Sequence, residues 1–206
     1  MKIPTFIMQD PRLMATYKYA NHHHSAMEQV RKYTNEPYIV HPVDVADICN
    51  TVAVKEHFDD ERRTRIMQAA LLHDVIEDTE ATYNEIENEF GREVRDLVFW
   101  CTDVTTKPQG NRRVRKELEL LRLVHAPSDA KFIKLADFIS NTRSIVDHDV
   151  GFATTYLSEK QAILDAFGYL LAESHGDTYK HVAPNKRMLT LARKSLLEGR
   201  DKISKP

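Results

Sequence analysis

The fold of this chain is decided by the stretch Ala69-Ala70-Leu71-Leu72-His73-Asp74-Val75-Ile76-Glu77-Asp78-Thr79. At helical period its apolar residues fall on one side, where Leu71 pairs with Val75 one turn later. Residues three and four apart are neighbours on a helix, so its polar residues share the other side. These are His73, Asp74, Glu77 and Asp78. Burying a polar cluster in an apolar helix costs free energy, which favours a cation-binding site over the alternative of a solvated carboxylate face.

The composition of the whole chain predicts an all-α fold. The length of 206 residues suits a single domain over 1–206. Only six glycines and few alternating β-branched runs argue against a sandwich or barrel. A net charge of −2 argues against a protein that coats nucleic acid or an anionic membrane. The sequence assigns no oligomeric state.

The cysteines and the absence of long apolar runs predict a cytoplasmic location. Cys49 and Cys101 lie in apolar helical patterns, outside any Cys-x-x-Cys pair, and are expected to be buried free thiols. No run is long enough to span a membrane. Residues 1–8 are too short, and too interrupted by Pro4, for a secretory signal. The last few residues are expected to be disordered.

Helix start and stop signals divide the chain into a series of helices. Asp10 before Pro11 predicts a helix that runs to about residue 32 and contains His22-His23-His24, expected to be partly solvated. Asp59 predicts the start of the helix that contains the opening stretch, and Gly91 the end of a short one. Further helices are expected at about 94–101, 112–124, 129–146, 162–171 and 189–197.

Two more candidate ligands come from other parts of the chain. Pro37 and Pro42 predict a loop over 31–42, with Pro42 opening the next helix and His41 held immediately before it. Asp137 lies in a largely apolar helix, where a buried acid is rare without a partner, and Asn141 follows one turn later. Together with His73 and Asp74 these residues offer nitrogen and oxygen ligands that suit manganese, iron, zinc or magnesium.

These blocks resemble the HD-domain hydrolases of the RelA/SpoT family, whose small stand-alone members degrade the alarmone (p)ppGpp. The resemblance rests on 37–42 (PYIVHP), on 69–79, and on Lys134-Leu135-Ala136-Asp137 with Asn141. It implies an HD-domain helical bundle with a metal core at about 15–146 and C-terminal helices at about 151–200. It also implies one manganese ion, with the ligands His41, His73, Asp74 and Asp137.

The resemblance further implies how the reaction is carried out. Glu77 and Asp78 match the family's catalytic pair, Arg31-Lys32 its basic loop over the substrate, and Asn141 a polar contact near the nucleotide. The implied reaction is hydrolysis of the 3′-pyrophosphate of ppGpp or pppGpp to GDP or GTP and pyrophosphate. From residue chemistry, Glu77 is expected as general base with Asp78 as its positioning partner. Lys107 and Arg112 are further candidates to neutralise the pyrophosphate.

The sequence departs from the family pattern in two places, and other functions stay open. The family commonly has a histidine where this chain has Ala26 or Met27, and one of His22 to His24 is a candidate to replace it. The segment between His41 and His73 is also longer than in the family. The alternatives are a phosphatase acting on another nucleotide such as NADPH and a non-catalytic nucleotide sensor. Nucleic-acid binding through 112–116 is disfavoured, because this basic run has no aromatic platform.

Overall fold

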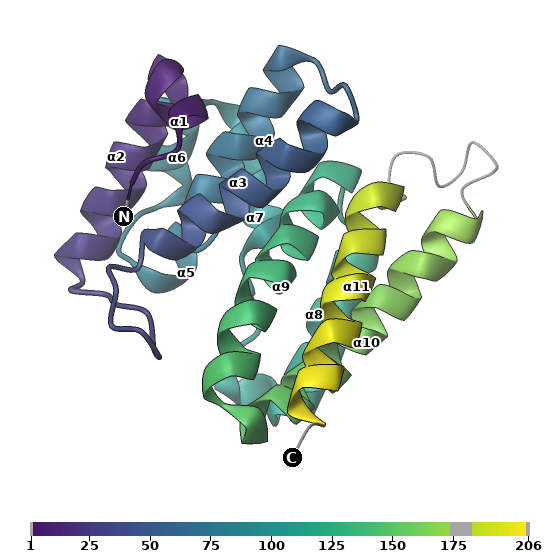
Figure 1. Cartoon of the computed structure of the whole chain (residues 1–206). Helices are drawn as coiled ribbons and strands as arrows, with labels where there is room; N and C mark the ends of the chain where they lie inside the picture. Colours follow the sequence, from purple (N-terminus) through teal and green to yellow (C-terminus); the bar gives the residue numbers. More distant parts are fainter. Residues whose placement is uncertain (1, 174–182, 205–206) are drawn as a thin grey trace. The chain divides into compact units, whose positions relative to one another are not determined.

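The computed structural model describes residues 2–173 and 183–204, and these residues are organised as helices joined by short connections (Figure 1). Within that part of the chain there is no β-strand, only an isolated bridge between Val30 and Pro37. The predicted all-α class is therefore confirmed. Residues 205 and 206, at the end expected to be disordered, lie outside the described residues.

The chain divides into two compact units, 1–102 and 103–206; the single domain over 1–206 stays a prediction. The helices of the first unit are α1 (Thr5–Gln9), α2 (Pro11–Ala26), α3 (Val40–Lys55), α4 (Asp60–Leu72), α5 (Val75–Asp78), α6 (Tyr83–Phe90) and α7 (Arg92–Cys101). Those of the second unit are the 3₁₀ helix η1 (Lys107–Gln109), α8 (Arg112–Val124), α9 (Ser128–His148), α10 (Val150–Glu173) and α11 (Lys186–Ile203).

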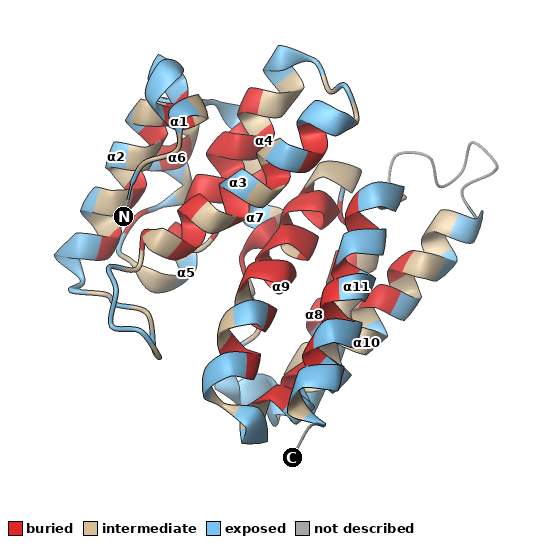
Figure 2. Cartoon of the chain, in the orientation of Figure 1, coloured by how far each residue is buried: buried red, intermediate tan, exposed pale blue. Residues whose placement is uncertain are grey.

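Helix α4 is the central helix of the first unit. It packs against α2, α3 and α7, and its residues 66–72 are all buried, as the red ribbon of Figure 2 shows. Full burial of each large apolar side chain, such as Leu71 or Leu72, contributes about 1.5–3 kcal/mol relative to exposure. His73 thus directly follows a fully buried stretch of the central helix.

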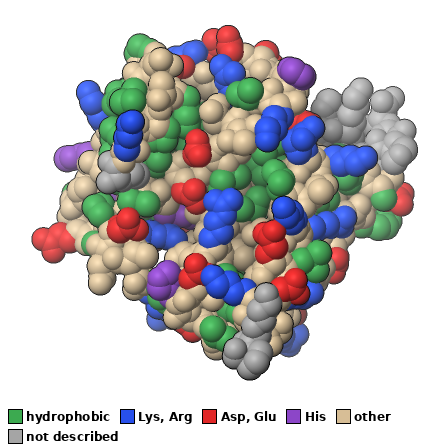
Figure 3. All heavy atoms as spheres, in the orientation of Figure 1, with side chains coloured by type: hydrophobic (Ala, Val, Ile, Leu, Met, Phe, Trp, Pro, Cys, Tyr) green, Lys and Arg blue, Asp and Glu red, His purple; other side chains and the backbone are tan. Residues whose placement is uncertain are grey.

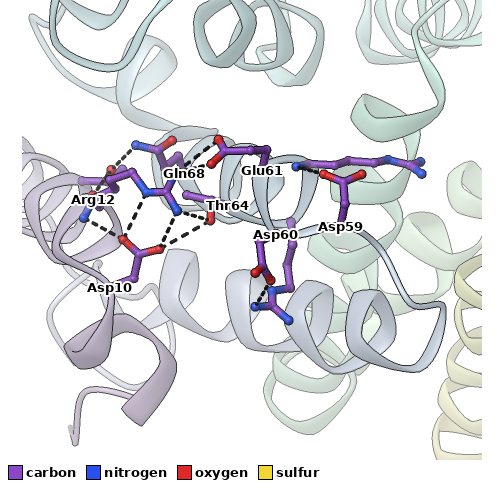
Figure 4. Close-up of polar contacts among 10 residues, drawn as sticks. Asp10, Arg12, Asp59, Asp60, Glu61, Thr64 and Gln68 are labelled. Carbon is purple, nitrogen blue, oxygen red and sulfur yellow. Dashed lines mark hydrogen bonds and ion pairs between the residues drawn. The ribbon is translucent and has the colours of Figure 1, made fainter.

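A polar cluster at the start of α2 ties this helix to α4 (Figure 4). The Asp10 carboxylate accepts a hydrogen bond from the Arg12 backbone N–H at 2.8 Å, which confirms the predicted helix start. The Arg12 guanidinium then reaches α4, where it donates to Glu61 at 3.0 Å and to Thr64 at 3.1 Å. Because Arg12 bridges the two helices, α2 is fixed against the central helix at its first turn.

The second unit is built around α9, which packs against α10 and α11. Gly199 of α11 allows a close approach, because an added Cβ would lie 3.2 Å from side-chain atoms of both Thr142 and Val146 on α9. Lys131 of α9 is fully buried, and its Nζ donates to the carbonyl oxygens of Val124 at 3.0 Å and Ala126 at 2.5 Å. It thereby satisfies carbonyl groups at the end of α8.

Several predicted helix boundaries were wrong, and two of them affect candidate ligands. Helix α2 ends at Ala26, well before residue 32, and α10 begins at Val150, earlier than expected. Helix α3 begins at Val40, so His41 lies in its first turn and not ahead of it. Helix α4 ends at Leu72, where the His73 ring bonds to the Ala70 carbonyl, so the expected helical stretch is interrupted by a turn before α5.

Other predictions are confirmed by local geometry. Gly91 has a φ of 87° and separates α6 from α7, as its predicted capping role requires. Cys49 and Cys101 are both buried, and neither forms a disulfide with a described residue. No helix among the described residues is long and apolar enough to cross a membrane. On the face drawn in Figure 3, Lys and Arg side chains are interspersed with Asp and Glu, in keeping with the net charge of −2.

Candidate metal centre

The first unit gathers three of the predicted ligands, His41, His73 and Asp74, in one cluster. Their ligand atoms lie within 4.8 Å of one another. The Asp74 carboxylate oxygen Oδ2 is 3.1 Å from His73 Nε2 and 3.6 Å from His41 Nε2. His41 comes from the first turn of α3, and the other two residues form the turn between α4 and α5. Both histidines are buried, so the cluster is shielded from bulk water on its imidazole side.

The proton position on His73 fits a metal ligand. Its Nδ1 lies 2.8 Å from the carbonyl oxygen of Ala70. A carbonyl oxygen can only accept, so Nδ1 carries the proton, and Nε2, 3.1 Å from Asp74 Oδ2, keeps a lone pair that can bind a metal ion. A backbone carbonyl that fixes the tautomer in this way is a common support for metal-binding histidines. Two imidazole nitrogens and a carboxylate oxygen form a donor set that suits a divalent transition-metal ion.

Tyr38 supports the third member of the cluster. Its hydroxyl donates to Asp74 Oδ2 at 2.6 Å, and its ring centroid lies 5.9 Å from that of His41. Tyr38 belongs to the segment between α2 and α3, residues 27–39, which we call the α2–α3 loop. The sequence placed Tyr38 inside a family block but gave it no role, because a contact across 36 residues leaves no local signal.

The predicted catalytic carboxylates lie on α5, directly after the cluster. Glu77 is exposed, whereas Asp78 is half-buried and accepts a hydrogen bond from Gln29 Nε2 at 2.9 Å. Gln29 in turn bonds to His24 Nδ1 at 2.6 Å through its oxygen. Sequence reasoning missed Gln29 and left three histidines as candidates to replace the missing family residue. Of these, His24 is buried and contacts the site, whereas His22 is exposed.

The α2–α3 loop also carries the predicted basic pair. Its two ends are joined by the bridge between Val30 and Pro37 and by a hydrogen bond from the Arg31 N–H to the Glu36 carbonyl at 2.8 Å. Lys32 Nζ lies 3.1 Å from the Tyr33 hydroxyl and 4.7 Å from the centre of its ring. These contacts restrain the backbone that carries Arg31 and Lys32.

The other predicted ligand and its neighbour lie in the second unit. Asp137 of α9 accepts a hydrogen bond at 2.6 Å from Nδ2 of Asn141, which lies one helical turn later. Lys134 Nζ is 3.8 Å from the other oxygen of the Asp137 carboxylate. Lys134 and Lys116 also face Asp103; burial raises the pKa of that carboxyl, but the two lysines outweigh it and hold the pKa well below its usual range.

The two remaining basic residues differ in their surroundings. Arg112 at the start of α8 forms a two-pronged ion pair with Glu159, at 2.7 and 2.8 Å. It lines a cavity of about 730 Å³ that Lys116, Lys134 and Lys160 also line, with Leu120, Leu123 and Ile163 among its apolar walls. Lys107 is exposed on η1. The cavity thus belongs to the second unit and combines cations with an apolar floor.

Comparison with known proteins agrees with the resemblance in the sequence. The chain is 41% identical over 109 residues to guanosine-3′,5′-bis(diphosphate) 3′-pyrophosphohydrolase MESH1 of Xenopus tropicalis, which covers 53% of this chain and 56% of that protein. MESH1 of Mus musculus is 38% identical over 136 residues, covering 65% of this chain and 69% of that protein. The aligned part of the chain thus spans little more than half of the Xenopus relative.

Structural comparison extends the likeness over nearly the whole chain. A solved structure of a metazoan ortholog of SpoT, which hydrolyzes ppGpp and plays a role in starvation responses, matches with a TM-score of 0.70 at 25% identity. The match covers 92% of this chain and 96% of that one. The family description "HD domain" fits residues 16–167. Since that range is most of the sequence, the chain belongs to the HD domain family and is similar to its small stand-alone MESH1 members.

Proposed function

We propose that this protein is a divalent-metal-dependent hydrolase that removes the 3′-pyrophosphate of the guanosine alarmones ppGpp and pppGpp. Its products are GDP or GTP and pyrophosphate. The observation that carries this proposal is the buried cluster of His41, His73 and Asp74, with ligand atoms within 4.8 Å, in a member of the HD domain family. The similarity to the MESH1 pyrophosphohydrolases and to the metazoan SpoT ortholog that hydrolyzes ppGpp supports this substrate.

We further propose manganese as the metal, with Asp137 as a fourth ligand beside the three residues of the cluster. The mixed nitrogen and oxygen donors support a divalent ion, and the family resemblance supports manganese and Asp137. When bound, a divalent ion lowers the pKa of coordinated water and withdraws charge from phosphoryl oxygens. Cys49 and Cys101 are buried and form no disulfide with a described residue, which supports a reducing cytoplasm as the location.

The two carboxylates of α5 receive different roles. Glu77 is exposed and so is accessible to water, which supports it as the general base that takes a proton from the attacking water. Asp78 is half-buried and restrained by Gln29, which supports it as the group that orients the water. Arg31 and Lys32 neutralise charge on the pyrophosphate, since guanidinium and ammonium groups stabilise the charge that spreads over phosphate oxygens.

Three residues of the second unit are proposed as nucleotide contacts. Asn141 carries a side-chain amide that can both donate and accept hydrogen bonds, which suits a contact with the nucleotide. Arg112 is held by Glu159, so a phosphate must compete with that carboxylate for its guanidinium. Lys107 is exposed on η1, and its ammonium group is proposed to neutralise charge on the pyrophosphate.

Phosphorus NMR of the purified protein with Mn²⁺, given ppGpp and in parallel NADPH, tests the proposal. Pyrophosphate and GDP from ppGpp, abolished by a chelator, is the expected result. Orthophosphate from NADPH with ppGpp intact would retain the metal site and reassign the substrate. No product from either nucleotide in a metal-loaded protein would favour a nucleotide sensor.

A further inference from the structure

His24 occupies an unusual place in the first unit. It lies in the last turn of α2, is buried to all but 1% of its surface, and contacts two residues of the α2–α3 loop. Its ring centroid is 4.7 Å from that of Tyr38, and its Nδ1 is 2.6 Å from Gln29 Oε1. Each of these two neighbours bonds to a carboxylate of the candidate site, Tyr38 to Asp74 and Gln29 to Asp78.

The directions of the two hydrogen bonds that link His24, Gln29 and Asp78 follow from the chemistry of Asp78. An ionised carboxylate can only accept, so Gln29 must present its amide N–H₂ to Asp78. The oxygen of Gln29 is then the atom that faces His24. Because an amide oxygen only accepts, His24 Nδ1 must carry the ring proton. The hydrogen bonds therefore run from His24 to Gln29 and from Gln29 to Asp78.

The other ring nitrogen of His24 is consistent with this tautomer. His24 Nε2 is buried and has no hydrogen-bond partner among the described residues. A second proton there would leave a buried N–H unsatisfied, which is costly, whereas a bare lone pair is less so. His24 is therefore neutral, with its only ring proton committed to Gln29.

The turn at the end of α2 brings the two residues together. Glu28 adopts a φ of 51°, and the Gln29 backbone N–H donates to the His24 carbonyl oxygen at 3.1 Å. This turn folds Gln29 back onto the ring of His24 although five residues separate them. The arrangement depends on this local backbone and supplies an imidazole next to the site. In this chain Ala26 or Met27 stands where the family commonly has a histidine.

We propose that His24 is a positioning residue that orients the Asp78 carboxylate through Gln29, with the proton on Nδ1 as the linking atom. The inference rests on the proposed function, because Asp78 is a proposed catalytic group. His24 itself contacts neither the substrate nor the reacting atoms in this assignment. Removing its donor frees the Gln29 side chain to rotate, and Asp78 then samples orientations that do not support catalysis.

Nitrogen NMR of the full-length protein loaded with diamagnetic Mg²⁺ tests the linking atom without any substrate. We expect one histidine with a protonated Nδ1 and a bare Nε2 whose signals are missing from the His24→Asn protein. His73 is expected to show the same tautomer, so the assignment depends on this comparison. A proton on His24 Nε2 would overturn the proposal.

Kinetics of matched variants test the positioning role. His24→Phe keeps a ring against Tyr38 but removes the donor, and Gln29→Met keeps the chain length but removes the amide. We expect each to lower kcat by about 10- to 100-fold, with KM, metal content and Tm nearly unchanged. The double variant falls no further than the lower single variant. His24→Asn, which retains an N–H near the position of Nδ1, recovers most of the activity, and His22→Phe on the exposed face behaves as wild type.

The outcomes separate this proposal from the proposed function. The kinetic measurements use whichever of ppGpp and NADPH the wild-type protein hydrolyses. An error in the proposed substrate is therefore detected with the wild type, whereas an error in the positioning role of His24 is detected with the variants. If the losses of kcat were additive in the double variant, or if Gln29→Met had full activity, the positioning role of His24 would be overturned. If His24→Phe does not fold, Gln29→Met and His24→Asn still decide the question.

Discussion

At the scale of single residues, the ligands and the carboxylates of α5 are expected to differ in what their loss removes. Asp74 contacts both histidines of the cluster, so Asp74→Ala is expected to lose the metal together with activity. Glu77 is exposed and outside the cluster, so Glu77→Ala is expected to retain the metal and lose turnover by about 100-fold or more. Metal content measured beside the rate distinguishes the two. A metal-free but active Asp74→Ala protein would contradict the ligand assignment.

A second residue-scale prediction concerns Lys131. Burial lowers the pKa of its amine from 10.5 to about 8. Between these two pH values the unfolded chain holds a proton that the folded protein has released, so stability gains from this group as pH rises from about 8 to 10.5. The slope contributed is at most about 1.4 kcal/mol per pH unit. Urea unfolding of wild type and Lys131→Met across this range measures it, and equal slopes would refute the assignment.

The sequence carries local signals for the proposed ligands but not for the residues that contact them. His41, His73 and Asp74 carry strong local signals, namely a proline neighbour, helical spacing and a family motif. The supports His24, Gln29 and Tyr38 act across long separations: Gln29 contacts Asp78 over 49 residues and Tyr38 contacts Asp74 over 36. Helical periodicity relates only residues within a few turns, so it contains no information about these pairs.

At the scale of elements, two glycines predict opposite effects of the same substitution. Gly91 joins α6 to α7 with a φ of 87°, which an L side chain rarely adopts. Gly91→Ala is therefore expected to destabilise the protein by about 1 kcal/mol although no atom lies within 4 Å of the added Cβ. Gly151 lies in the first turn of α10, where an added Cβ meets only the Asp149 side chain at 3.9 Å. Gly151→Ala is expected to stabilise by about 0.4–1 kcal/mol.

Chemical denaturation of both variants checks this pair. If the free energy of unfolding changed with the same sign in both proteins, backbone conformation at the glycine would not explain the effects of the two substitutions. The comparison is matched, because each variant adds one methyl group at a helix boundary.

Helix identities followed from the sequence more reliably than helix ends. Asp10, Asp59 and Gly91 set ends through their own side chain or backbone, and each acts as predicted. The break after Leu72 was not predicted, because residues 69–79 have an uninterrupted helical pattern. It is associated with the hydrogen bond from the His73 ring to the Ala70 carbonyl in the last turn of α4. Such a side-chain bond competes with the helical backbone hydrogen bonds, and hydrophobic spacing contains no information about it.

At the scale of the whole molecule, metal binding and folding are expected to be linked. A ligand that binds only the native state stabilises it by about 2.7 kcal/mol at 100 times its Kd. Thermal unfolding is compared with Mn²⁺ bound and after chelation. We expect a higher Tm with Mn²⁺ in the wild type and no such Tm shift in His41→Ala. The Asp137→Asn protein tests the proposed fourth ligand. If the shift in that variant equals that of the wild type, Asp137 is not a ligand.

The HD domain match spans 16–167 and thus draws helices from both units. Family membership followed from separated sequence blocks in both of these units, and the comparisons agree with it. The division at residue 102 was not predicted, because no proline-rich, glycine-rich or charged linker marks that position in the sequence.

The α2–α3 loop has a consequence for how this protein diverges from its relatives. The cluster residues sit in or beside α3 and α4, whose buried positions tolerate little change, whereas Arg31 and Lys32 sit on a surface loop with few buried neighbours. Substitutions of Arg31 and Lys32 therefore alter the charge presented to a nucleotide at little cost to stability. Selection can in this way exchange one substrate for another while the inherited metal chemistry persists, and the variation between relatives is expected to concentrate in residues 30–36.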